Sequence, residues 1–157
     1  MNETTSGAMR LPSVWDPAPS TTVRMSRVRR SGSTPELVVR KVVRELGGTY
    51  RTQNQDLPGS PDLANRTRRW AIFVHGCFWH RHSCRRATIP RRNQSLWEAK
   101  FERNRRRDRR AIRALRDLGF LVVVVWECRV KDEARLRQRL RAQLHGRFPR
   151  RRSGLAP

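Results

Sequence analysis

The stretch WAIFVHGCFWHRHSC, residues 70–84, joins an apolar run to a loop that holds most of the metal-binding side chains of the chain. It contains three of the four histidines and two of the three cysteines, and the third cysteine follows a second apolar run. Four residues match the ligand count of a closed tetrahedral zinc site: Cys77, His82, Cys84 and Cys128. They predict a structural Zn²⁺ that fixes the loop to a sheet edge, whereas the alternative is three unrelated buried thiols. Spacing alone leaves His80 as an alternative ligand to His82.

Apolar patterns on either side of this stretch predict a small α/β domain. Residues 62–64 and 70–74, joined by a polar turn, predict a β-hairpin, and residues 50–53 predict a strand before it. The continuous apolar run 120–126 predicts a strand that is buried on both faces. Helical spacing predicts three helices, over residues 34–46, 95–118 and 132–144, the first with Thr34 as its capping hydroxyl. This order predicts a mixed central sheet flanked by helices.

The chain is strongly basic. Its 36 Lys+Arg against 13 Asp+Glu, in 157 residues, give a formal net charge of +23. Nearly all of the basic residues are arginines, which bind phosphate oxygens in a bidentate manner. This composition favours a nucleic-acid partner over the alternative, a coding bias toward arginine. Arginines cover nearly every face of the predicted helix 95–118, so only some of them can reach phosphate.

Composition divides the chain into three parts. Residues 1–33 predict a disordered basic tail or arm, residues 34–146 a folded domain, and residues 147–157 a basic C-terminal tail. The odd number of cysteines predicts metal binding in a reducing compartment and not a disulfide framework. The longest apolar run is too short for a membrane helix, and no secretory signal is visible. We expect a cytoplasmic, nucleoid-associated monomer.

Pro61 and Asp62 precede the hairpin whose second strand ends at His75. Nucleases of the PD-(D/E)-x-K type place an aspartate on one strand and an acid-x-lysine on the next, and here Phe73 and His75 stand at the latter positions. Phosphodiester hydrolysis needs a water nucleophile, neutralisation of phosphate charge and help for the leaving oxygen. A carboxylate that holds Mg²⁺ and a histidine that titrates near neutrality meet these needs. Asp62 is therefore the candidate Mg²⁺ ligand, with a histidine as the base.

Four separated blocks follow one another in a specific order: LPGSPD (57–62), FVHGCFWH (73–80), NRRRD (104–108) and VWEC (125–128). Together they resemble the very short patch repair endonuclease family, over roughly residues 25–144. The resemblance implies a restriction-endonuclease-like fold with a structural zinc. It also implies a Mg²⁺-dependent endonuclease that nicks one strand of double-stranded DNA beside a T:G mismatch, the product of 5-methylcytosine deamination.

The resemblance implies a role for each catalytic candidate. Asp62 would bind Mg²⁺, assisted by the main-chain carbonyl of Val74, which stands where better-known relatives carry threonine. His75 and His80 would lie at the scissile phosphate, and either of them is the candidate base. Two further acids would support them: Glu36, which would reach the metal-bound waters or His80, and Asp108, which would orient a histidine. The alternatives are that Glu36 only complements the helix dipole and that Asp108 only pairs with arginines.

The resemblance also implies side chains that part the base stack at the mismatch. The candidates are Phe78, Trp79, Trp97, Met25 and Val28, the last two on an N-terminal arm. Core packing is the alternative for the three aromatic residues, and Trp70 and Trp126 are expected in the core. Two other functions stay open: a zinc-stabilised nucleic-acid-binding protein without catalysis, and a restriction-type nuclease that cuts both strands. Other DNA repair proteins are candidate partners.

Overall fold

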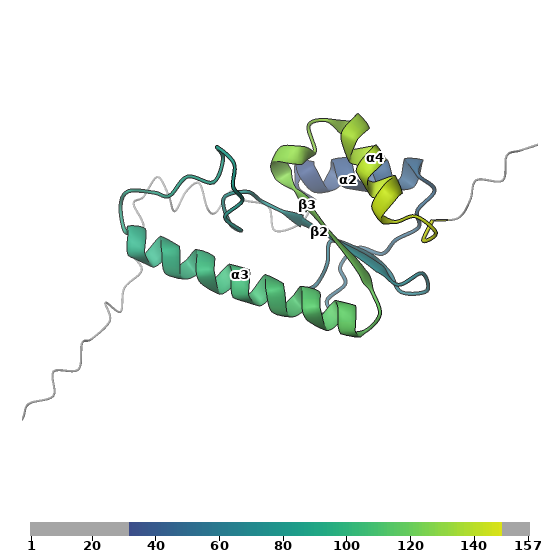
Figure 1. Cartoon of the computed structure of the whole chain (residues 1–157), viewed down its shortest axis with the longest axis horizontal. Coiled ribbons are helices and arrows are strands. Elements are labelled where there is room, and N and C mark those ends of the chain that lie inside the picture. The colour runs from purple at the N-terminus through teal and green to yellow at the C-terminus, as the bar shows by residue number, and fades with distance from the viewer. Residues whose placement is uncertain (1–31, 149–157) are drawn as a thin grey trace, which may run out of the picture.

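The protein folds as a three-stranded sheet with helices on both faces (Figure 1). The structure, a computed structural model, describes residues 32–148. The predicted arm residues Met25 and Val28, and most of the two predicted tails, lie outside the described residues. Across residues 32–148, no helix combines the length and apolarity that a membrane span requires.

The sheet is mixed, as predicted. Strands β1 (Leu63–Asn65) and β2 (Trp70–His75) form the expected antiparallel hairpin, and β2 pairs in parallel with β3 (Leu121–Trp126). A parallel pair needs a long crossover, which here is made by the basic helix α3 (Gln94–Asp117) and the loop before it. The register pairs His75 with Trp126, so the chain leaves both strands at the same edge of the sheet.

Helices α2 (Thr34–Glu45) and α4 (Glu133–Gln143) pack together on one face of the sheet (Figure 1). Their apolar sides and the sheet residues beneath them form the larger core: Val39, Val42, Val43, Leu63, Trp70, Ile72, Val123, Val125, Val130, Leu136, Leu140 and Leu144. Trp70 is fully buried there, as expected.

Helix α3 covers the other face of the sheet only in part. Its Ala111 and Leu115 pack against Ala71, Phe73 and Phe120. The prediction that 120–126 is buried on both faces is therefore wrong. Val123 and Val125, which point toward α2 and α4, are buried, whereas Val122 and Val124 on the α3 side stay partly exposed. The uncovered part of this face, beside the end of β3, is where the cleft described below lies.

Two local predictions are also corrected. The expected strand at residues 50–53 is only a single bridge between Arg51 and Ala64. Helix α2 is capped at Ser33 and not at Thr34, which is already helical. The Ser33 hydroxyl donates to Glu36 Oε1 at 3.0 Å and makes no cap bond with the backbone, because the buried carboxylate takes that hydroxyl as one of its partners.

Candidate active site and metal centre

The first cluster of functional side chains lies where β2 and β3 end. Cys77 comes two residues after β2, and Cys128 comes two residues after β3, in the short 3-10 helix η1 (Glu127–Arg129). Because the two parallel strands end in register, the two cysteines reach the same edge of the sheet. The loop then returns His82 and Cys84 to this edge. The ligand atoms of all four residues lie within 4.8 Å of one another.

The geometry of this cluster fits a zinc ion. His82 Nδ1 lies 3.4 Å from Cys128 Sγ and 3.8 Å from Cys77 Sγ. Tetrahedral bonds of about 2.3 Å to sulfur and about 2.1 Å to nitrogen put the two ligand atoms about 3.6 Å apart. The structure brings His82, and not His80, to the three sulfurs. Burial raises the pKa of the Cys77 thiol to about 12, so its thiolate form requires a nearby cation.

Glu127 supports the metal loop and was not singled out from the sequence. Its Oε2 accepts the Cys77 N–H at 3.3 Å, and its Oε1 pairs with Arg86 at 2.9 Å. One carboxylate at the end of β3 thus holds both the beginning of the loop and a residue farther along it. The only sequence signal was its place in the VWEC block.

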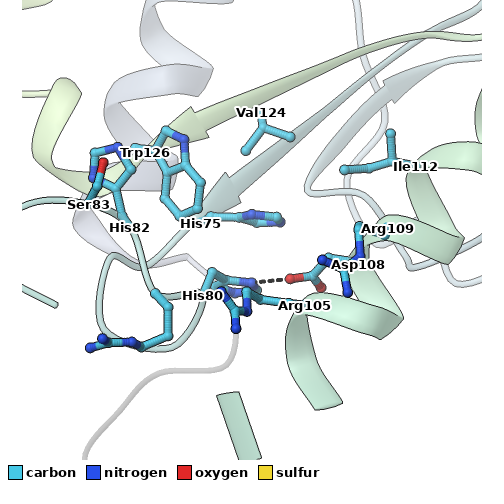
Figure 2. Close-up of a pocket in the computed structure, with 11 residues that line it drawn as sticks. His75, His80, His82, Ser83, Arg105, Asp108, Arg109, Ile112, Val124 and Trp126 are labelled. Carbon is cyan, nitrogen blue, oxygen red and sulfur yellow. Dashed lines mark hydrogen bonds and ion pairs between the residues drawn. The ribbon is translucent and has the colours of Figure 1, made fainter. Parts of the chain in front are cut away.

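The second cluster lies beside the first and contains His75, His80 and Asp108, whose ligand atoms also lie within 4.8 Å of one another (Figure 2). The imidazole rings of His75 and His80 are stacked, with centroids 3.9 Å apart and an interplanar angle of 6°. Nδ1 of His80 contacts the Asp108 carboxylate, which α3 presents across the cleft. Figure 2 shows His82 beside Trp126, on the other side of the histidine pair from Asp108.

Two adjoining cavities open on the histidine pair. One, of ≈ 430 Å³, is lined by the histidines together with Arg105, Arg109 and Trp126. The other, of ≈ 270 Å³, brings Asp62 and Val74 to the same histidines and to Asp108. Five of the residues predicted from the sequence therefore share one cavity. Asp62 faces the histidine cluster across this space and is not among the three residues whose ligand atoms converge.

The approach to Asp62 is fixed by a tightly packed loop. Gly59 has a φ of +74°, and a Cβ there would lie 2.4 Å from the Ala111 Cβ of α3, so only glycine allows this contact. Buried Asn54 donates its side-chain amide to the Pro61 carbonyl at 2.9 Å. The Val74 N–H donates to Asp62 Oδ2 at 2.7 Å. Asn54 gave no recognisable sequence signal, because a polar residue in a loop usually contacts water.

The surroundings in the cleft shift the pKa values of its ionisable groups in different directions. Burial, with a further contribution from the Glu36 charge, raises the pKa of Asp62 to about 6. Burial, followed by the charge of His80, lowers the pKa of His75 to about 4, so His75 is neutral at pH 7. Burial acts to raise the pKa of Asp108, but its hydrogen bond to His80 and the surrounding positive charges outweigh this, and the pKa lies below its ordinary value.

Glu36 has the contacts of a helix-start acid. It is 6% exposed and accepts hydrogen bonds from Gly32 N at 2.8 Å, from the Ser33 hydroxyl and from Arg40 at 3.2 Å. It does not line either cavity on the histidine pair. Its charge nevertheless acts on Asp62. These contacts favour the alternative, that Glu36 only complements the helix dipole, and its contact with metal-bound waters or with His80 stays a prediction.

The aromatic candidates form one cluster, in which Phe78 and Trp79 of the metal loop meet Trp97 of α3. Phe78 contacts Trp79, Trp97 and Phe101 edge to face, with ring centroids 5.0 to 5.4 Å apart. Phe78 and Trp79 are partly exposed, whereas Trp97 is only 4% exposed and packs as a core residue. Asn104 on α3 holds this loop by donating to the Trp79 carbonyl at 3.1 Å.

The prediction that Trp126 belongs to the core is wrong. Its ring is partly exposed in the cleft, stacks on His82 with centroids 4.4 Å apart, and meets His75 edge to face at 5.4 Å. Trp126 therefore separates the two histidine clusters. The apolar run that predicted strand β3 could not reveal which face of the strand α3 leaves open.

Comparison with known proteins finds similarity to Vsr endonucleases and to nicking enzymes. The family model described as DNA mismatch endonuclease Vsr matches residues 13–86. Type II nicking enzyme V.XorIIP of Xanthomonas oryzae is 43% identical over 117 residues, which cover 74% of this chain and 86% of that protein. Type II nicking enzyme V.NmeAIP of Neisseria meningitidis is 37% identical over 116 residues, covering 74% and 83%. DNA mismatch endonuclease Vsr of Escherichia coli is 36% identical over 115 residues, covering 71% and 74%.

Proposed function

The chain belongs to the Vsr family of DNA mismatch endonucleases, and from this premise we propose that it nicks one strand of duplex DNA beside a T:G mismatch in a Mg²⁺-dependent reaction. The observation that carries this proposal is the single cavity shared by Asp62, His75, His80 and Asp108. A buried carboxylate that shares a cavity with two imidazoles can hold a cation beside a general base, as metal-assisted hydrolysis needs.

His80 is the proposed general base. Its Nδ1 faces Asp108, which leaves Nε2 as the nitrogen available to take a proton from the attacking water. The Asp108 carboxylate then stabilises the imidazolium that forms and holds the ring in one orientation. His75 is neutral, so it can donate one hydrogen bond to a phosphate oxygen without adding positive charge next to His80.

Asp62 is the proposed ligand of the catalytic cation. The Val74 N–H occupies one of its oxygens, and the cavity on its open side is lined by polar groups of the cluster. Its raised pKa means that a bound cation would relieve the cost of burying the charge. When bound, Mg²⁺ supplies charge neutralisation at the phosphate and assistance to the leaving oxygen. The Val74 carbonyl is the proposed second protein ligand.

Zinc has a separate, structural role in this proposal. Its proposed ligands are Cys77, His82, Cys84 and Cys128, a set that leaves no open coordination position for chemistry. The ion would hold the loop that carries His80 and the partly exposed Phe78 and Trp79, the proposed wedges at the mismatch. Residues 34–146 form the proposed catalytic domain, in a restriction-endonuclease-like arrangement.

The test compares labelled duplexes that differ only at one base pair. We expect the T:G duplex to be nicked in one strand when Mg²⁺ is added, and the matched duplex to stay intact. Equal cleavage of both duplexes would reject mismatch specificity. Binding of the T:G duplex without cleavage, at any Mg²⁺ concentration, would favour a non-catalytic DNA-binding protein.

A further inference from the structure

Trp126 is the last residue of β3, and core packing does not explain its place there. Among the described residues, its indole belongs to neither of the two buried apolar clusters. It stays partly exposed in the cleft, whereas Ala111 and Leu115 of α3 pack against Ala71 and Phe120, nearer the start of the strands. A tryptophan usually stabilises a fold by burying its large apolar surface. The role of this indole must therefore come from the groups that it contacts.

The ring contacts of this indole within residues 32–148 are all with histidines. It stacks on His82 with centroids 4.4 Å apart, and it meets His75 and His80 edge to face at 5.4 and 6.5 Å. Figure 2 shows the indole between His82 and His75. The register explains this contact, because His75 and Trp126 are partners on neighbouring parallel strands. Their side chains leave the sheet on the same face, from strands that lie about 4.8 Å apart.

The two imidazoles of the cleft are held in different ways. Nδ1 of His80 contacts Asp108 of α3. The ring of His75 has no hydrogen-bond partner within the described range, although this residue is only 7% exposed. Its ring contacts there are with Phe73, His80 and Trp126. Ring packing alone therefore limits the rotation of the His75 side chain, and the indole bounds it on the side of β3.

We propose that Trp126 is a positioning residue for the nicking reaction, because its indole fixes the His75 ring in the orientation that reaches the scissile phosphate. The inference rests on the proposed function, in which His75 donates a hydrogen bond to a phosphate oxygen. A displacement of about 1 Å in such a group can cost about 10²-fold in rate. The indole acts through His75 and does not touch the reacting atoms. Its stack on His82 ties it in turn to the metal loop.

The test uses the full-length, zinc-loaded chain and the variants Trp126→Leu and Trp126→Phe. Leucine stays apolar but has no ring, whereas phenylalanine keeps an aromatic edge toward His75. The control is Val122→Ala, which removes apolar packing on the same face of β3 and lines neither cavity on the histidine pair. The measurements are kcat and KM for a T:G duplex, the zinc content, and the nuclear Overhauser contact between the His75 and His80 rings without DNA.

For Trp126→Leu we expect a full equivalent of zinc, an unchanged KM and a kcat that is lower by about 10²-fold. KM should not change because the arginines bind the duplex, whereas His75 acts on the transition state. The contact between the His75 and His80 rings should weaken as well. Trp126→Phe should recover most of kcat together with this contact. Val122→Ala should keep the wild-type kcat, even if it unfolds at a lower temperature.

A wild-type kcat for Trp126→Leu, or an equal loss of kcat in the leucine and phenylalanine variants, overturns the proposal. Loss of zinc together with kcat overturns it as well, because Trp126 would then act on the metal loop. An unchanged contact between the His75 and His80 rings in Trp126→Leu overturns it in every case. This last measurement needs no activity, so it still decides the role of Trp126 if the wild-type chain nicks no T:G duplex and the proposed function fails.

Discussion

Two histidines that are two positions apart in the sequence belong to different clusters in the structure. His82 faces three sulfurs in a closed set of four ligands, whereas His80 faces Asp108 at the edge of an open cavity. A set that fills all four positions of a tetrahedral ion can only hold the chain in place. A set that borders open space can admit water and phosphate. The function of each imidazole therefore depends on the element it contacts, η1 for His82 and α3 for His80.

The largest effect is expected for Cys128→Ser, because it removes a ligand that joins the loop to the end of β3. The variant should lose most bound zinc, unfold at a markedly lower temperature and fail to nick DNA, since the loop that carries His80 is no longer held. Metal content by mass spectrometry and thermal unfolding are the measurements. The control is Thr88→Ala, an exposed position in the same segment between β2 and α3. A stable Cys128→Ser protein with a full equivalent of zinc would remove Cys128 from the ligand set.

The substitution Asp62→Asn should impair catalysis at the open cavity without affecting the zinc site. We expect nicking to fall by at least about 10³-fold, because the proposed ligand of the catalytic cation loses its charge. Zinc content should not change. Single-turnover nicking and metal analysis on the same preparation test this. Nicking at the wild-type rate would exclude Asp62 from the mechanism, and loss of zinc would mean that the two clusters depend on each other.

The substitution Asp108→Asn tests the contact between α3 and His80 in the cluster that borders the open cavity. An amide keeps the shape but cannot stabilise the imidazolium of His80, so nicking should fall by roughly 10²-fold. The matched control is Asp117→Asn, an exposed position at the end of the same helix, which should keep full activity. Initial rates over a range of pH are the measurement. An unchanged rate and pH profile for Asp108→Asn would exclude a catalytic contribution from Asp108 and would mean that it only pairs with arginines.

The pKa of Asp62 predicts a pH-dependent difference in stability. Its folded-state pKa is raised from 3.8 to about 6, so the ionised form destabilises the metal-free fold. The penalty is absent below about pH 4, grows between pH 4 and 6, and is complete above pH 6, where it is on the order of 3 kcal/mol. Without added Mg²⁺, Asp62→Asn should therefore be more stable than wild type at pH 7.5, and the two should converge near pH 4.

Denaturant unfolding at several pH values measures this difference. Added Mg²⁺ should stabilise wild type at pH 7.5 but not the Asp62→Asn variant, because the ion binds the charged carboxylate. A constant stability difference from pH 4 to 7.5 would mean that Asp62 is not the group that titrates.

Most of the fold follows from local sequence patterns, and so does the composition of both clusters. The helices, the hairpin and β3 each carry their own periodicity, and their observed bounds agree with those expected within one or two residues. The LPGSPD, FVHGCFWH and NRRRD blocks contain most of the residues that line the cavity, including Asp62, His75, His80 and Asp108. These features were predictable because most of the residues that define them lie within short blocks of the sequence, although Asp108 and Cys128 belong to separate blocks.

The features that could not be predicted depend on how distant elements meet. The exposure of Trp126 depends on how far α3 extends over the sheet, and the separation of His80 from His82 depends on the register of β2 and β3. Trp97 fits equally the apolar side of a helix and a base-stacking role, and only its burial in three dimensions distinguishes them. Hydrogen bonds such as that from Asn54 to Pro61 produce no periodic pattern in the sequence that could predict them.

The smallest effect is expected for Asn104→Ala, which changes the support of the loop between the two clusters without touching a ligand. Asn104 donates to the Trp79 carbonyl at 3.1 Å, and its loss should cost about 1 kcal/mol of stability. Trp79 and His80 are neighbours, so the loop should also hold the proposed wedge and base less firmly. We expect a few-fold loss of T:G nicking with zinc retained, whereas Gln138→Ala, at an exposed position on α4, should leave the rate unchanged. A loss as large as that of Asp62→Asn would assign Asn104 to the chemistry itself.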